Sequence, residues 1–124
     1  MNNMLTIVTQ EFYGNRTITS VFEDELDWFL IGWVDADLGK TLKGEWEKIA
    51  RKEIDIPNTD FVLIYNPKEE EKKIKDGDSN VLGRIPELNL EIHSRCLICR
   101  RDKDGNLVSI TPDDYKNAIK YLAE

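Results

Sequence analysis

Two cysteines and the only histidine lie close together in the sequence, so metal binding and redox chemistry are the first activities to test. Cys96 and Cys99 form a C-x-x-C pair, and His93 precedes Cys96 by three residues. The surrounding residues alternate between apolar and polar types, as in a β-strand, where residues three apart point to opposite faces. The two sulfur atoms then cannot share a zinc ion, and a redox pair belongs at a helix N-terminus. We expect two structural free thiols and no metal or other cofactor.

Two further segments resemble ligand-binding loops but depart from them at critical positions. The segment 39–41 (Gly-Lys-Thr) has the ending of a phosphate-binding loop, but Val34 occupies the position of its first glycine. The segment 76–87 carries oxygen-bearing side chains at four calcium-loop positions, but Val81 stands where the sharp turn needs glycine. We expect a helix cap at the first segment. At the second we expect a solvated turn that binds calcium no better than millimolar.

The acidic side chains are concentrated in one stretch of the chain. The 124 residues include 24 acidic and 17 basic side chains, for a net charge of −7. Residues 11–37 contain seven acids and only one base, Arg16, so this segment alone carries a net charge of −6. Carboxylates can hold the metal ions of a nuclease, but residues 17–39 contain no lysine or arginine to bind a phosphate chain. The charge balance disfavours nucleic acid and anionic membranes as partners and favours a basic protein.

The N-terminal part of the chain predicts a β-hairpin followed by a helix. Residues 5–13 and 16–20 are rich in β-branched residues and flank Gly14-Asn15, a typical hairpin link. Ser20 and Glu23 have the spacing of a capping box, and apolar residues then recur at helical spacing, which predicts a helix over 21–34. The alternative is a buried strand, because residues 28–34 form an uninterrupted apolar run.

The rest of the chain predicts a second hairpin, a central strand and two more helices. A second helix is expected over 42–53, and the apolar run 61–65 predicts a central strand within 60–66. Residues 68–80 are highly charged and are expected to form a solvated excursion that begins as a helical turn. Alternation predicts a long strand over 88–100 that pairs with 107–110, and Thr111-Pro112 predicts the start of a helix over 112–123.

Together these elements predict an α+β fold in a single domain over residues 1–124. An antiparallel sheet would contain the two hairpins and the central strand, with three helices covering one of its faces. The chain begins without a signal peptide pattern and contains no apolar run long enough to cross a bilayer, so we expect a cytoplasmic protein. The strand order and the oligomeric state are not determined by these patterns.

The function favoured by the sequence is that of a non-catalytic inhibitor, of the bacterial immunity or antitoxin kind. Its acidic and aromatic segment would bind a basic toxin such as a nuclease, whose active-site cleft is positive because its substrate is a polyanion. The expected contact residues are Glu23, Asp24, Glu25, Asp27, Trp28, Asp35 and Asp37, with Trp28 as the central anchor. The alternatives are a small carboxylate- or metal-dependent hydrolase that uses the same segment, and an antagonist whose carboxylates mimic DNA phosphates.

Overall fold

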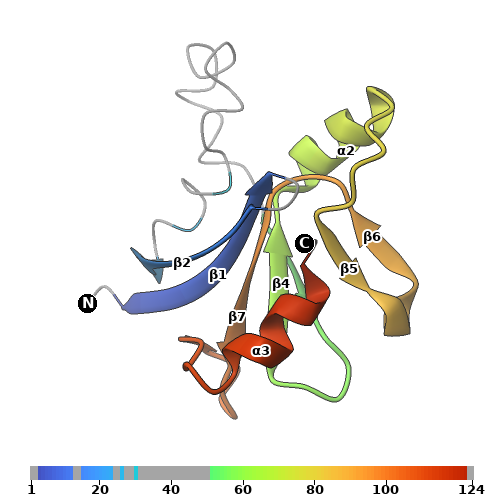
Figure 1. Cartoon of the computed structure of the whole chain (residues 1–124). Helices are drawn as coiled ribbons and strands as arrows, with labels where there is room; N and C mark the ends of the chain where they lie inside the picture. The colour runs from blue at the N-terminus through green and yellow to red at the C-terminus, as the bar shows by residue number, and fades with distance from the viewer. Residues whose placement is uncertain (1–2, 13–14, 24–25, 27–29, 31–50, 123–124) are drawn as a thin grey trace.

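The computed structural model describes residues 3–12, 15–23, 26, 30 and 51–122. These residues form an α+β fold, as predicted, with a six-stranded antiparallel sheet, a separate two-stranded sheet and two α-helices (Figure 1). The prediction of three helices packed on one face of the sheet is therefore wrong for the part of the chain that is described.

The main sheet has the order β2-β1-β7-β4-β3, and β8 pairs with β7 outside this path. The predicted hairpins are confirmed: β1 (Met4–Phe12) pairs with β2 (Asn15–Phe22), and β7 (Cys96–Arg101) pairs with β8 (Leu107–Val108). The apolar run predicted to be a central strand is β4 (Phe61–Tyr65), which lies between β7 and the edge strand β3 (Lys52–Asp55).

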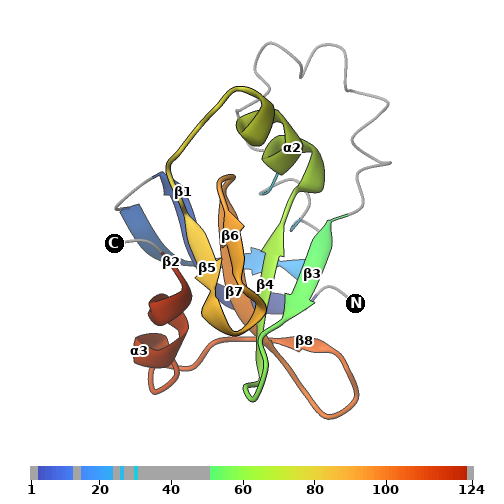
Figure 2. The same ribbon diagram turned by 90° about the vertical axis from the view of Figure 1, so that its right-hand side faces the viewer.

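Both faces of this sheet are buried. Face A includes Phe61 and Leu63, which pack against β5 (Gly83–Ile85), β6 (Leu90–Ile92) and α3 (Tyr115–Ala118). Face B includes Val62 and Ile64, alternate residues of the same strand, which pack with the N-terminal part of the chain. A strand buried on both sides needs apolar residues at every position. This explains the continuous apolar run of β4. Figure 2 shows the β5-β6 hairpin packed against the main sheet.

The predicted strand over 88–100 is interrupted at residues 93–95. β6 ends at Ile92 and pairs with β5 in the two-stranded sheet, whereas β7 begins at Cys96 in the main sheet. Leu88, predicted on the core side, lies in the 3₁₀ helix η4 (Pro86–Leu88) and is 46% exposed. The interruption has an identifiable cause, because the backbone N–H groups at 93 and 94 donate to the side chain of Glu70 instead of a neighbouring strand.

The charged segment after β4 is more ordered than predicted. It forms the nine-residue helix α2 (Pro67–Lys75), which lies beyond the end of β4 (Figure 1). Asn66 caps this helix, since its Oδ1 accepts a hydrogen bond of 2.9 Å from the backbone N–H of Lys68, and proline occupies the first helical position. The end of the strand is therefore also the start of the helix.

The C-terminal helix is shorter than the predicted 112–123. Residues 111–114 form a turn, and α3 continues into the 3₁₀ helix η5 (Ile119–Tyr121). The predicted pairing of Thr111 with Asp114 is present, with Thr111 Oγ1 donating to Asp114 Oδ2 at 2.6 Å. Asp114 also contacts Arg100 of β7 at 3.3 Å, which ties the turn to the sheet. One side of this C-terminal segment faces the core, where Ala118 and Leu122 are buried.

The two other predicted helices have incorrect boundaries. The helix predicted over 21–34 does not begin at residue 21, because β2 continues through Phe22. Ser20 lies in β2 and its hydroxyl contacts that of Thr6, so it is no helix cap. Leu26 and Leu30 have helical backbone, and residues 24–25, 27–29 and 31–34 lie outside the described residues.

The helix predicted over 42–53 overlaps an observed strand. Lys52 and Glu53 begin β3, where they pair with Tyr65 and Ile64 of β4, so the predicted end is wrong. Residues 42–50 lie outside the described residues. Pairing with a buried central strand outweighs the helical spacing of the preceding residues at this point.

Candidate functional site

The structure describes one of the seven residues predicted to contact a partner. Glu23 directly follows β2 and is half-buried, and its backbone N–H donates to the carbonyl of Asn3 at 2.8 Å. The other six, Asp24, Glu25, Asp27, Trp28, Asp35 and Asp37, lie outside the described residues. The part of the acidic segment that follows β2 is thus fixed at its start to the β1-β2 hairpin by a backbone hydrogen bond.

The acidic segment is also joined to the sheet by two leucines. Leu26 and Leu30 are fully buried on face B, where they belong to a cluster with residues of β1, β4, β7 and β8. Residues four apart share one side of a helix, and both leucines were predicted on the apolar side of this segment. The burial of both confirms that part of the prediction.

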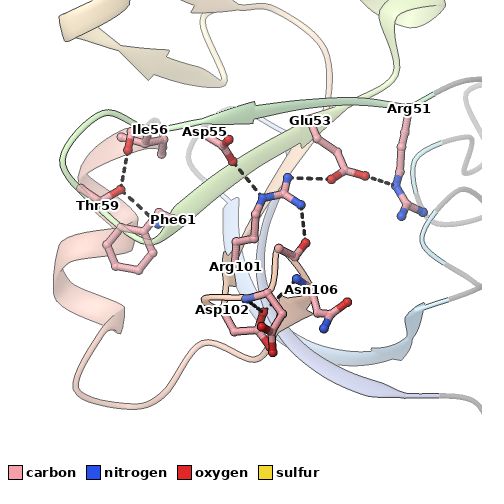
Figure 3. A network of polar contacts seen from close by, with 11 residues as sticks. Arg51, Glu53, Asp55, Ile56, Thr59, Phe61, Arg101, Asp102 and Asn106 are labelled. Carbon is pink, nitrogen blue, oxygen red and sulfur yellow. Dashed lines mark hydrogen bonds and ion pairs between the residues drawn. The ribbon is translucent and has the colours of Figure 1, made fainter.

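A chain of alternating charges crosses the same face from β7 to β3. Arg101 donates to Glu53 at 2.8 Å and to Asp55 at 3.0 Å, and the second oxygen of Glu53 accepts from Arg51 at 2.8 Å (Figure 3). Burial raises the pKa of Glu53, but its hydrogen bonds to the two arginines outweigh burial and lower the pKa below its ordinary value. Because every charge in this network has an opposite partner, its role is to hold β3 and β7 across β4.

A cluster of buried charges at the start of α2 was not predicted from the sequence. Glu70 Oε1 accepts the backbone N–H groups of His93 at 2.7 Å and Ser94 at 2.8 Å. Glu69 pairs with the buried guanidinium of Arg95, with 3.4 Å between Oε2 and Nε. The sequence shows the two acids in the first turn of the helix. Their burial could not be predicted from it, because it depends on residues 93–95 folding back onto α2.

Burial shifts the pKa of two groups at this cluster, Glu69 and Tyr65. Burial raises the pKa of Glu69, and Arg95 opposes the shift only in part. Burial also raises the pKa of Tyr65, and the charge of Glu70 adds to that shift. The carboxylates hold three consecutive backbone N–H groups at the turn between β6 and β7. The arrangement therefore acts as a structural clamp at the point where the chain passes from the two-stranded sheet into the main sheet.

The two cysteines lie on opposite faces of β7, as strand alternation predicts. Cys96 packs on face A and Cys99 on face B, and both are buried free thiols. Burial raises the pKa of Cys99 to about 12. Burial also raises the pKa of Cys96, and the charges of Glu70 and Glu69 raise it further. Both groups are thiols rather than thiolates at neutral pH, so neither is an activated nucleophile.

A shallow groove lies where α3 meets the start of β4. One part has a volume of about 330 Å³ and the adjoining part about 340 Å³, and both are lined by Asp60 and Arg100. Arg100 is occupied, since its Nε donates to the carbonyl of Ser109 at 2.9 Å and contacts Asp114 at 3.3 Å. Acidic and basic side chains both line the groove, so it favours neither an anionic nor a cationic ligand.

Among the described residues, no group of three or more histidine, cysteine, aspartate or glutamate side chains could hold a metal ion. Within the same part of the chain, no helix is long and apolar enough to span a membrane. Comparison of the chain with protein-family models, curated proteins and solved structures gave no match.

Proposed function

We propose that this protein is a non-catalytic inhibitor, of the immunity or antitoxin kind, that binds a basic toxin such as a nuclease. Its contact surface is the acidic segment, with Glu23, Asp24, Glu25, Asp27, Asp35 and Asp37 supplying charge and Trp28 supplying the central anchor. The chain acts by covering the positive cleft of its partner and does no chemistry there.

One observation carries this proposal: the acidic segment is attached to the folded sheet. A segment of charge −6 with no attachment would be a flexible tail, which has to lose much conformational entropy when it binds. Burial of Leu26 and Leu30 on face B fixes this segment at two points four residues apart. The helical spacing of the sequence predicts Trp28 on the side opposite the apolar residues, which favours it as the anchor.

The acids and the tryptophan have different tasks in this proposal. Acidic charge accelerates encounter with a basic surface at separations up to the Debye length, which is about 8 Å at physiological salt. A buried aromatic anchor instead slows dissociation, and its loss typically costs about 2 kcal/mol or more. Association rate and dissociation rate therefore report on the two parts of the surface separately.

The test is a charge reversal with a matched control. The variant Glu23→Lys, Glu25→Lys, Asp27→Lys is compared with a variant in which three exposed acids elsewhere are reversed: Glu71, Asp76 and Asp104. Both variants change the net charge equally. Association with the basic partner protein, measured by surface plasmon resonance, should slow at least tenfold for the first variant and much less for the control.

Three further outcomes are decisive. Trp28→Ala should leave the association rate near that of the wild type and accelerate dissociation at least tenfold. Equal association rates for the two charge-reversed variants would refute the proposal, because the effect would then depend on net charge alone. Turnover of a phosphodiester substrate by the purified chain, lost in the first variant, would instead establish the hydrolase alternative.

A further inference from the structure

The two edges of the main sheet have opposite characters. The edge strand β3 is short, and three of its four residues are charged, with Glu53 and Asp55 both held by Arg101. Short, charged edges are a common protection against pairing with another chain. The edge strand β2 has eight residues, of which only Arg16 is charged, and it contains neither proline nor glycine. It therefore lacks the features that protect β3.

The strand β2 is also exposed at its surface. Thr17, Ile18 and Ser20 are exposed, and the exposed fraction of Ile18 is 53%. Within the described ranges β2 pairs only with β1, on one of its two sides, and Figure 1 shows it at the margin of the sheet. Alternate backbone N–H and C=O groups of an edge strand point outward, and an added strand can bond to them.

We propose that the outer edge of β2 binds an extended strand of the basic partner, which adds to the sheet as a seventh strand. This inference rests on the proposed function and specifies how the partner is held. Eight residues at about 3.3 Å each provide a main-chain template about 26 Å long. Ile18 supplies an exposed apolar contact beside that template.

Charge identifies the kind of strand that fits. Glu23 directly follows β2, and residues 11–37 carry a net charge of −6 even with Arg16 of β2 included, so this part of the chain attracts a lysine- or arginine-bearing strand. A second copy of this chain would bring the same −6 segment to the contact, and like charges oppose that pairing. The observations therefore favour a basic partner over self-association through β2.

The test uses a defined peptide with the full chain. The probe is an octapeptide that alternates valine and lysine, and its control is the same peptide with every second backbone amide methylated. We expect the probe to shift NMR signals of alternate β2 amides and to slow their hydrogen exchange at least tenfold. The methylated peptide should do neither, because it cannot complete the ladder. Equal binding by both peptides, no binding at millimolar concentration, or shifts confined to other elements would overturn the proposal.

A pair of equal substitutions tests the edge itself. Ile18→Lys places a charge on β2, and Ile74→Lys places the same charge on α2, where Ile74 is 59% exposed. The first should weaken binding of the probe at least tenfold, and the second should change it less than threefold. Both positions are exposed, so neither change should unfold the protein.

The remaining outcomes separate this inference from the proposed function. Slow exchange of the outward β2 amides in the protein alone would show that the edge is already paired. If that protection grows with protein concentration, a second copy occupies it. Either result overturns the inference. If reversal of the acids slows the partner's association but the Ile18→Lys variant binds that partner normally, the inhibitor proposal stands and strand addition fails.

Discussion

Removing the carboxylate of Glu70 should destabilise the protein far more than its position in a charged helix suggests. Glu70→Ala leaves two backbone N–H groups without their acceptor, those of His93 and Ser94, at 2.7 and 2.8 Å in the native protein. A buried donor without a partner costs about 1–3 kcal/mol. The Ser94 hydrogen bond is buried and the His93 bond is part-buried, so we expect a loss of about 3 kcal/mol.

The assay is equilibrium unfolding in urea. With a slope of about 1.5 kcal/mol per molar, the midpoint of the Glu70→Ala variant should fall by about 2 M. Glu70→Gln keeps a carbonyl oxygen as acceptor and should lose less than half as much. The matched control is Glu71→Ala, the exposed next residue of the same helix, which should change stability by less than about 0.5 kcal/mol. Equal midpoints for Glu70→Ala and Glu71→Ala would refute the assignment of Glu70 as the clamp of the β6-β7 turn.

Three further results are expected from the same structure. Glu53 has a lowered pKa, so its contribution to stability is present above its ordinary pKa of 4.5 and is lost as the pH falls through the lowered value. In unfolding curves measured at decreasing pH, the stability advantage of the wild type over Glu53→Gln should therefore shrink over that pH range. Gly83→Ala should lower the free energy of unfolding by about 1–3 kcal/mol, because a Cβ there would lie 2.9 Å from Cys96 Sγ and 3.2 Å from Leu63 Cδ1. In a double-mutant cycle measured by thermal unfolding, adding Cys96→Ala should recover part of that loss. Cys96 and Cys99 should react with a thiol reagent at pH 8 only after unfolding, and fast labelling of the native protein would contradict their burial.

Local patterns were sufficient where neighbouring residues decide the structure. The β-branched residues on both sides of Gly14-Asn15 predicted the β1-β2 hairpin, and strand alternation placed Cys96 and Cys99 on opposite faces. The uninterrupted apolar run 61–65 predicted a central strand, because only a strand covered on both sides tolerates no polar position. In each case the pattern that predicts the structure lies within a few residues along the chain.

The errors occur where distant residues compete for the same backbone groups. Nothing near Ile92 indicates that the strand over 88–100 must break, because the acceptor that takes the N–H groups of 93 and 94 comes from Glu70, more than twenty residues earlier. The helix predicted to end at residue 53 is likewise replaced by β3, since β4 offers a buried strand with which Lys52 and Glu53 can pair. Pairing with a preformed partner outweighs the small energies of helical propensity.

For the candidate site, the sequence by itself determined the charge, and the tertiary structure decided the attachment. Seven acids against Arg16 between residues 11 and 37 are a property of composition, and they favour a basic partner before any fold is known. That Leu26 and Leu30 lie buried on face B, and that β2 rather than β3 is the exposed neutral edge, depends on the strand order. Strand order is set by long-range packing of both sheet faces, and no periodicity along the chain encodes it.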